Sequence, residues 1–344
     1  MHMADALLSP SVGAALWAVS GSIIAYSSQK IRREADDWKV PLMGVLGAFV
    51  FSAQMVNFTI PLTGSSGHLG GGLLLSILLG PYAAFLTIAS VLVVQALFFA
   101  DGGLLALGCN IFNLGFFPAF IAYPLIYRKI AGSQPTPATI TIGAIVASIS
   151  GLQLGAFSVV LETLASGITS LPFSTFALLM QPIHLPIGIV EGIVTAMVVS
   201  FVRNARPEIL QGHHNAPSTG TFPVRTTVIT FLALALVIGG LASRFASEKP
   251  DGLEWSIQKA NGMQELETGK SGIHRALAAL QETMALLPDY TFKKTGSTKP
   301  VHESPFDNSM LGTSIAGVVG GLLALVLSLA IGFIVRKRSA PQEN

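Results

Sequence analysis

The chain has 344 residues, of which 51% are apolar and only 11% are charged, and its mean hydropathy is +0.63. A soluble domain has about 25% charged residues, so this composition excludes a water-soluble globular protein and predicts an integral membrane protein. The net charge of +2 gives no indication of a nucleic-acid partner, and the single cysteine, Cys109, excludes a disulfide within the chain and argues against a thiolate metal site.

The apolar stretches predict helices, because a backbone exposed to lipid must satisfy its hydrogen bonds internally. We expect helices at about 10–29, 41–60, 69–80, 81–100, 104–126, 138–165, 177–203, 225–243 and 310–335. The 69–80 segment is too short to cross a bilayer at about 20 residues per crossing, so it should be a short or tilted helix within the bundle. The predicted fold class is an all-α membrane protein, with a seven-helix bundle and a two-helix C-terminal appendage.

A change in composition after the seventh helix divides the chain into two membrane domains. Residues 207–222 are rich in proline, glycine and polar residues, which predicts a cytoplasmic linker. Residues 1–206 then form the first domain. Residues 223–344 form the appendage, whose two transmembrane helices flank an extracellular loop at 244–308.

Histidines also occur in these polar regions. His213 and His214 in the linker could bind a metal ion or could simply be solvated. In the long loop, the amphipathic segment at about 274–287 predicts a short helix. The only histidines of the appendage, His274 and His302, lie in this hydrophilic loop, so no metal-ligand cluster is expected there.

Lysine and arginine residues predict the orientation of the chain. Twelve of the twenty lie at alternate helix ends: four at 30–39, two at 128–129, three at 203–225 and three at 336–338. The other eight lie in the 244–308 loop, which is long enough to escape the positive-inside rule. We therefore expect a multi-pass plasma-membrane protein with its N-terminus outside and its C-terminus in the cytoplasm. No basic cluster precedes the first helix, so we expect the N-terminal segment to be retained.

The first residues of the chain, Met1-His2-Met3-Ala4-Asp5, suggest a metal chelate. The Met1 amine, the deprotonated His2 backbone nitrogen and a His2 ring nitrogen can close two fused rings on one ion. Square-planar nitrogen sites suit Ni(II) or Cu(II). His68, within the glycine-rich loop 64–72, would supply the fourth nitrogen. The alternative is a frayed terminus with His68 in an ordinary turn.

Four polar residues could hold the metal ligands in place without binding the ion themselves. A metal-bound imidazole usually donates its second N–H group to an oxygen acceptor, and the nearest candidates in sequence are Asp5, Asn57, Ser65 and Ser66. Each of them could equally cap a helix.

Ionisable groups within predicted membrane helices are costly and need a reason. They include Glu162, His184 and Glu191, of which the last two are seven residues apart and share one helix face. They could line a metal path, contact a metal-bound group, or form a hydrogen bond that fixes the bundle. A different class of function would be a membrane-embedded metalloenzyme, a hydrolase that uses His184 and Glu191. The chain has no HExxH motif and no phosphate-binding loop, so ATP would have to be hydrolysed by a partner.

Three segments resemble the CbiM/NikM family over about residues 1–205: MHMADALLSP, NFTIPLTGSSGHLGGG and HLPIGIVEG. These proteins are the substrate-binding membrane components of energy-coupling-factor uptake systems for cobalt and nickel, with a link to cobalamin biosynthesis. A further segment, Pro250-Asp251-Gly252-Leu253-Glu254, resembles the PDGLE signature of the small companion subunit.

The resemblance implies the same four nitrogens, from the Met1 amine, the His2 amide, the His2 ring and the His68 ring. It implies a transporter rather than an enzyme, with Ni(II) or Co(II) as transported substrate and no cofactor. The implied partners are a transmembrane coupling protein, cytoplasmic ATPase subunits and the lipid bilayer. The appendage is expected to assist metal loading.

Overall fold

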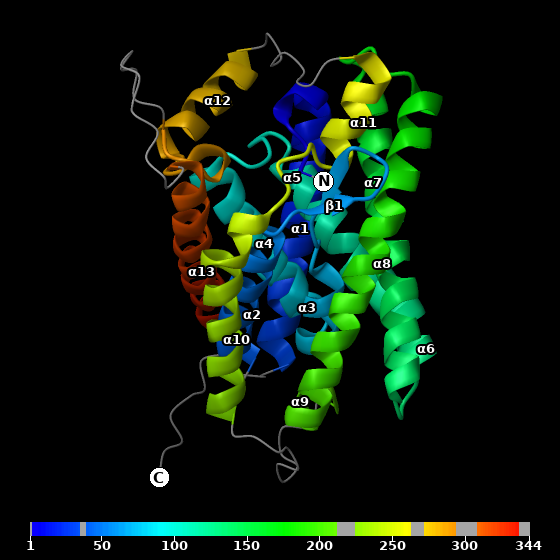
Figure 1. Ribbon diagram of the computed structural model, residues 1–344, viewed down its shortest axis with the longest axis vertical. Helices are drawn as coiled ribbons and strands as arrows, with labels where there is room; N and C mark the ends of the chain where they lie inside the picture. The colour runs from blue at the N-terminus through cyan, green and yellow to red at the C-terminus, as the bar shows by residue number, and fades with distance from the viewer. Residues whose placement is uncertain (1, 35–38, 212–223, 263–271, 294–307, 337–344) are drawn as a thin grey trace.

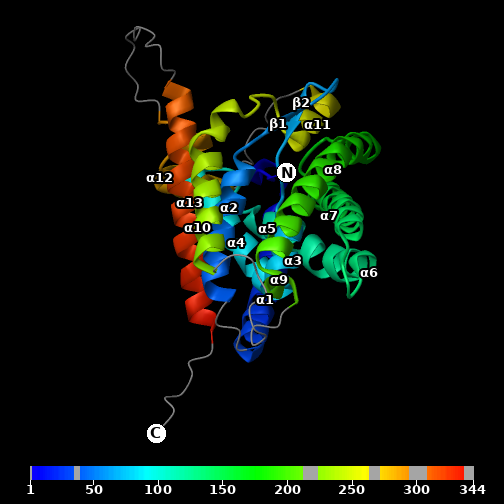
Figure 2. The same ribbon diagram turned by 60° about the horizontal axis from the view of Figure 1, so that its bottom comes forward.

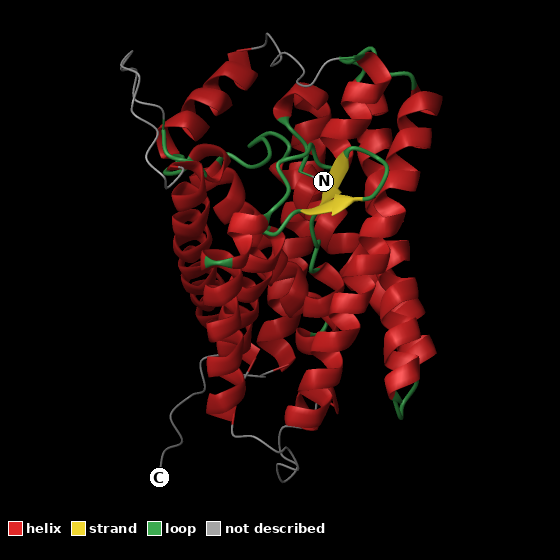
Figure 3. Cartoon of the chain, viewed as in Figure 1, coloured by secondary structure: helices red, strands yellow, loops and turns green. Residues whose placement is uncertain are grey.

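The computed structural model describes residues 2–34, 39–211, 224–262, 272–293 and 308–336. Almost all of the regular structure in these ranges is helical (Figures 1 and 3), which confirms the predicted all-α membrane fold. The helices are η1 (Asp5–Leu7), α1 (Pro10–Glu34), α2 (Lys39–Gln54), α3 (Gly72–Leu79), α4 (Pro81–Phe99), α5 (Leu107–Ile111), η2 (Phe112–Tyr127), α6 (Arg128–Ala131), α7 (Pro137–Ser166), α8 (Phe173–Ala205), α9 (Pro207–Gln211), α10 (Val224–Gly240), η3 (Ala242–Phe245), α11 (Gly252–Asn261), α12 (Gly272–Met284), η4 (Pro288–Tyr290) and α13 (Asn308–Val335).

Several of these helices are long and apolar enough to cross a bilayer. Within the described ranges there are six such stretches: Pro81–Phe99, Leu107–Ala131, Pro137–Ser166, Phe173–Ala205, Arg225–Phe245 and Leu311–Val335. The chain is thus a multi-pass membrane protein. The count of seven crossings plus two stays a prediction, because α2 has only 16 residues and α1 does not reach the same hydropathy.

The two long helices of the appendage pack directly on the first domain. Figure 2 shows α10 and α13 beside α2, while the α7–α8 hairpin lies on the other side of the bundle. Gly239 of α10 meets Gly317 of α13, where no space is left for a side chain on either residue. Small residues at such a crossing allow close packing, which drives helix association in a membrane.

The short predicted helix is present as α3, and every one of its residues is buried. It is bounded by Gly71 and Gly80, with φ angles of +78° and +80°, a backbone conformation that favours glycine. Pro81 then begins α4, where its missing N–H group costs no hydrogen bond.

The predicted helix at 41–60 is wrong beyond Gln54. The chain turns there and forms a two-stranded antiparallel hairpin from β1 (Phe58–Ile60) and β2 (Ser65–Gly67), in which Thr59 pairs with Ser66. The apolar residues of 55–60 suggested a continuing helix, but this segment pairs with the polar loop that carries His68. The hairpin lies at the same end of the bundle as α11 and α12 (Figure 1).

The appendage loop is more structured than the sequence suggested. It contains η3, α11, α12 and η4, and α12 confirms the short helix predicted at about 274–287. Although His274 belongs to this hydrophilic loop, its side chain is buried and its Nε2 lies 2.9 Å from the carbonyl oxygen of Leu8. His302, His213 and His214 lie outside the described residues. The predicted linker begins with the helix α9.

Candidate metal centre

The N-terminal segment is built into the protein interior. Met3 is fully buried, and its backbone exchanges two hydrogen bonds with Asn110: the Met3 N–H donates to Oδ1 at 2.8 Å, and Nδ2 donates to the Met3 carbonyl oxygen at 3.2 Å. The Gly103 N–H donates to the same carbonyl at 2.9 Å. The segment from His2 onward is therefore fixed against α5 instead of frayed. Met1 lies outside the described residues.

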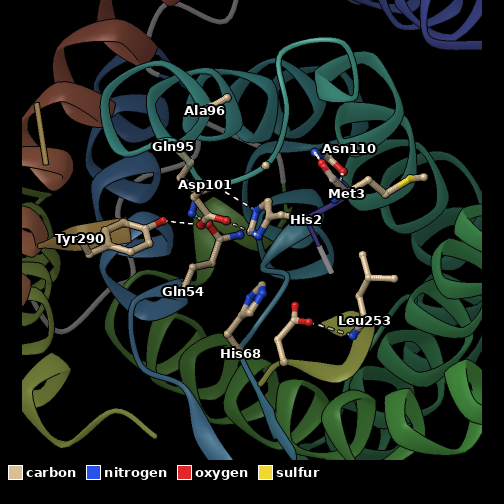
Figure 4. A network of polar contacts seen from close by, with 12 residues as sticks. His2, Met3, Gln54, His68, Gln95, Ala96, Asp101, Asn110, Leu253 and Tyr290 are labelled. Atoms are coloured by element: carbon tan, nitrogen blue, oxygen red, sulfur yellow. Dashed lines mark hydrogen bonds and ion pairs between the residues drawn. The ribbon is translucent and has the colours of Figure 1, made fainter. Parts of the chain in front are cut away.

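The imidazole rings of His2 and His68 lie face to face (Figure 4). Their centroids are 5.2 Å apart and their planes differ by 14°. Desolvation and the neighbouring His2 ring lower the pKa of His68 to about 3, and burial lowers the pKa of His2 below its ordinary value. Both rings are thus neutral at physiological pH, the form in which imidazole binds metals.

The proton on the His68 ring has a defined position. Nδ1 lies 3.1 Å from the carbonyl oxygen of Leu69, which can only accept a hydrogen bond. Nδ1 must therefore carry the hydrogen, and Nε2 presents its lone pair. The predicted fourth ligand has the tautomer that a metal ion requires.

A relay of two glutamine side chains fixes the tautomer of His2. Gln54 donates from Nε2 to the Gly70 carbonyl oxygen at 2.8 Å, which orients its Oε1 to accept from Gln95 Nε2, also at 2.8 Å. Gln95 therefore presents its own Oε1 to His2 Nε2 at 3.2 Å, so that this ring nitrogen must donate. The lone pair of His2 is left on Nδ1, the nitrogen that can close a chelate ring with the histidine's own backbone nitrogen.

Asp101 lies opposite this lone pair. Its Oδ1 is 3.3 Å from His2 Nδ1, and its Oδ2 accepts a hydrogen bond from the Tyr290 hydroxyl (Figure 4). Two lone pairs that face each other repel unless a proton or a cation lies between them. Since burial disfavours the doubly protonated His2 ring, the arrangement suits a cation.

The four supporting residues predicted from the sequence form their hydrogen bonds with groups other than the His2 ring. Asp5 accepts a hydrogen bond from the Ala106 N–H at 2.9 Å, which anchors the N-terminal segment. The Asn57 carbonyl oxygen accepts from the Ser247 N–H, while Ser65 and Ser66 bond to the appendage. Sequence reasoning missed the residues that do contact His2, namely Gln95 and Asp101. The sequence could have pointed to Gln54 and Gln95, because each is a polar residue within a predicted apolar helix.

Glu191 holds the loop that carries His68. Its two carboxylate oxygens accept hydrogen bonds from the Gly70 and Gly71 N–H groups at 2.8 and 3.1 Å. These bonds join α8 to a loop, whereas the sequence alternative was a hydrogen bond between helices that fixes the bundle. Glu162 likewise accepts a hydrogen bond from Asn113 Nδ2 at 2.8 Å.

The PDGLE segment closes over the same loop. Asp251 caps α11 by accepting from the Leu253 and Glu254 N–H groups at 2.8 and 2.9 Å, and Glu254 accepts from the Asp251 N–H at 3.0 Å. This reciprocal pair is a capping box. Just before it, the Pro250 carbonyl oxygen accepts from the Ser66 N–H at 2.8 Å.

These elements enclose a cavity of about 320 Å³. His2 and His68 line it together with Asp101, Asp251 and Glu254. Across the described residues, no three side chains of histidine, cysteine, aspartate or glutamate converge as a complete metal site.

The fold and this site define a multi-pass membrane protein with a buried pair of neutral imidazoles at the hairpin end of its bundle. Residues 2–209 match the family described as the cobalt uptake substrate-specific transmembrane region, CbiM, and residues 225–337 match the PDGLE domain. The chain belongs to the CbiM family and carries a PDGLE domain at its C-terminal side. It is a transport protein and not an enzyme.

Individual relatives are similar to this chain over different parts of its length. A protein of Archaeoglobus fulgidus named for fused nickel transport, NikMN, is 31% identical over 338 residues, which cover 96% of this chain and 98% of that protein. The cobalt transport protein CbiM of Sorangium cellulosum is 30% identical and covers 61% of this chain and 94% of its own length. A crystal structure titled as a truncated transition metal transporter has a TM-score of 0.52 and 30% identity, and covers 62% of this chain and 100% of its own.

Proposed function

We propose that the protein captures Ni(II) or Co(II) as the substrate-binding subunit of an energy-coupling-factor transporter. The ligands are the Met1 amine, the His2 backbone nitrogen, His2 Nδ1 and His68 Nε2. The observation that carries this proposal is the pair of stacked neutral imidazoles, each with its proton held away from the proposed ion by a hydrogen bond. The names of the relatives, which include both nickel and cobalt transport proteins, support the same class of cargo.

Four nitrogens in a plane favour Ni(II) over ions that prefer oxygen ligands. Cu(II) would bind more tightly still in the general order of affinities, so selectivity rests on supply and on the shape of the site. The metal is cargo and not a resident cofactor.

We further propose that His2 and His68 face the outside of the cell. The basic ends of α1, α6 and α8 lie at the opposite end of the bundle from the hairpin. Short basic loops stay in the cytoplasm, and energy must come from cytoplasmic ATPase partners through a transmembrane coupling protein.

The appendage has a role in loading in this proposal. Its Lys249 and Pro250 carbonyl oxygens accept hydrogen bonds from Ser66, two residues before His68. Movement of this segment would change the access of a metal ion to the chelate, because the appendage supplies part of the wall of the 320 Å³ cavity.

The chelate is tested by moving the amine while every side chain is kept. Protein with its native N-terminus and protein with one added residue before Met1 are purified and dialysed against Ni(II), and the bound metal is measured together with its absorption spectrum. We expect one tightly bound ion in the native form and loss of tight binding in the extended form. A residue added after Asn344 is the matched control. Unchanged affinity in the N-terminally extended protein would refute the chelate.

A further inference from the structure

His184 has an unusual hydrogen-bonding state. Its Nδ1 lies 2.7 Å from the Met180 carbonyl oxygen, one turn earlier in α8, so that Nδ1 carries the hydrogen. Its Nε2 therefore presents a lone pair. The residue is only 1% exposed, and Nε2 has no hydrogen-bond partner among the described residues.

A buried acceptor without a partner is costly. The nitrogen gives up its hydrogen bonds to water and gains none in the protein, and such groups in native proteins call for an explanation. Among the described residues, the His184 ring makes no hydrogen bond to another helix. It also forms no catalytic pair with Glu191, because the Glu191 carboxylate accepts hydrogen bonds from the Gly70 and Gly71 N–H groups.

His184 also lines a second, small cavity. This cavity of about 10 Å³ is lined by His184, His68, Gly67, Asp251 and Gly252, among others. Its size is near the minimum for one water molecule, which is also enough for a small metal ion. Gly252 keeps the ring accessible, because a Cβ atom there would lie 3.3 Å from His184 Nε2.

His68 connects the two cavities. It lines the 320 Å³ cavity together with His2, and it lines the small cavity together with His184. Asp251 also lines both, and its carboxylate adds negative charge close to the two imidazoles. Imidazole nitrogens with a nearby carboxylate suit Ni(II), Co(II), Cu(II) and Zn(II).

We propose that His184 is a further metal-ligating residue, which forms with His68 a transfer site that the transported cation occupies while it enters or leaves the chelate. The inference rests on the proposed function, because the ion is the same cargo. His68 belongs to both sites, so the ion can exchange the amine, amide and His2 nitrogens for His184 without leaving His68. Having fewer protein ligands, the transfer site binds more weakly than the chelate.

The transfer site is tested in a background that lacks the chelate. Full-length His2→Ala protein is titrated with Co(II), and binding is followed by the visible absorption of nitrogen-bound cobalt. We expect one weakly bound ion, with an affinity at least tenfold lower when His184→Phe is added. His184→Gln, which keeps a polar side chain but replaces the imidazole nitrogen, should have the same effect and guards against a folding defect. His274→Phe, which removes another buried histidine, is the matched control.

A kinetic test uses the chain with its chelate intact. The loss of bound Ni(II) to an excess of EDTA should be about tenfold slower in His184→Phe, with loading slowed to the same extent and Kd changed less than twofold. A purely structural role would change Kd instead. Equal Co(II) affinity in the His2→Ala background with and without His184 would overturn the transfer site. Failure of the native chain to bind Ni(II) tightly would instead refute the chelate.

Discussion

The glutamine relay makes a quantitative prediction about metal affinity. Gln95→Leu removes the acceptor that holds the proton on His2 Nε2, and it also removes the donor to Gln54 Oε1. The ring is then free to place its hydrogen on Nδ1, the proposed metal ligand, where it competes with the ion. The substitution keeps the apolar volume of α4, so the helix itself should form as before.

The expected magnitude follows from the hydrogen bonds that are lost. Leaving a buried polar group without its partner costs about 1–3 kcal/mol. Since a change of 1.4 kcal/mol is tenfold in an equilibrium constant, Kd for Ni(II) should rise by about 10- to 100-fold. Replacing a residue that orients a metal ligand typically lowers the metal affinity about 10- to 100-fold, which is the same range.

The assay is a competition titration of purified protein with its native N-terminus against a chelator of known Ni(II) affinity. Gln153→Leu is the matched control, because Gln153 Nε2 also donates a partly buried hydrogen bond, to the Gln181 carbonyl oxygen at 2.8 Å, between α7 and α8. Gln95→Glu should lose less affinity than Gln95→Leu, since a carboxylate still accepts from His2 Nε2 although it no longer donates to Gln54 Oε1. If Gln95→Leu binds Ni(II) within twofold of the unaltered chain, the proposed tautomer control is refuted.

Three further predictions concern orientation, docking and loading. A cysteine at the fully exposed Leu62 should react with an impermeant thiol reagent on intact cells, whereas one at the exposed Ser133, at the other end of the bundle, should not; the reverse pattern would invert the topology. Gly252→Ala places a methyl group 3.0 Å from His184 Cε1, so thermal unfolding should show a loss of about 1–3 kcal/mol, and an unchanged Tm would show that α11 can shift freely. Truncation after residue 222 should leave a folded first domain, because lipid can cover the faces released by α10 and α13, while Ni(II) uptake by cells falls to background. Full uptake by the truncated chain would contradict a role in loading.

Hydropathy predicted the helices of this protein because a backbone in a membrane has few alternatives to a helix. Each apolar stretch, such as 138–165 or 310–335, contains a helix in the structure. The short helix α3 was also foreseen, since Gly70–Gly72 and Pro81 limit its length. The boundary at Gln54 was missed because the apolar residues that follow it pair as a strand, which composition alone does not distinguish from a helix.

The residues of the candidate metal site were likewise predictable from the sequence only in part. His2 was predicted as a ligand because its position relative to the amine is a property of the sequence, and His68 was predicted to supply the fourth nitrogen. Their role as ligands stays a prediction, while the structure brings the two rings together. Asp5 was one of four candidates to support a metal-bound imidazole, and its closeness to His2 in the sequence did not decide its hydrogen-bond partner. Its carboxylate accepts from Ala106, about a hundred residues away, and leaves the place near His2 to Asp101.

What the sequence by itself determined is therefore structure that lies within one segment: the apolar helices and the short glycine-bounded helix α3. The candidate chelate at His2 is likewise a prediction from one segment. Only the tertiary structure decided which distant groups complete that chemistry. The Gln54–Gln95 relay joins α2 to α4, and the PDGLE cap reaches from Pro250 back to Ser66. The tautomer of His2 and the unpartnered nitrogen of His184 depend on where each lone pair points, and that direction is set by packing between helices that are remote in the chain.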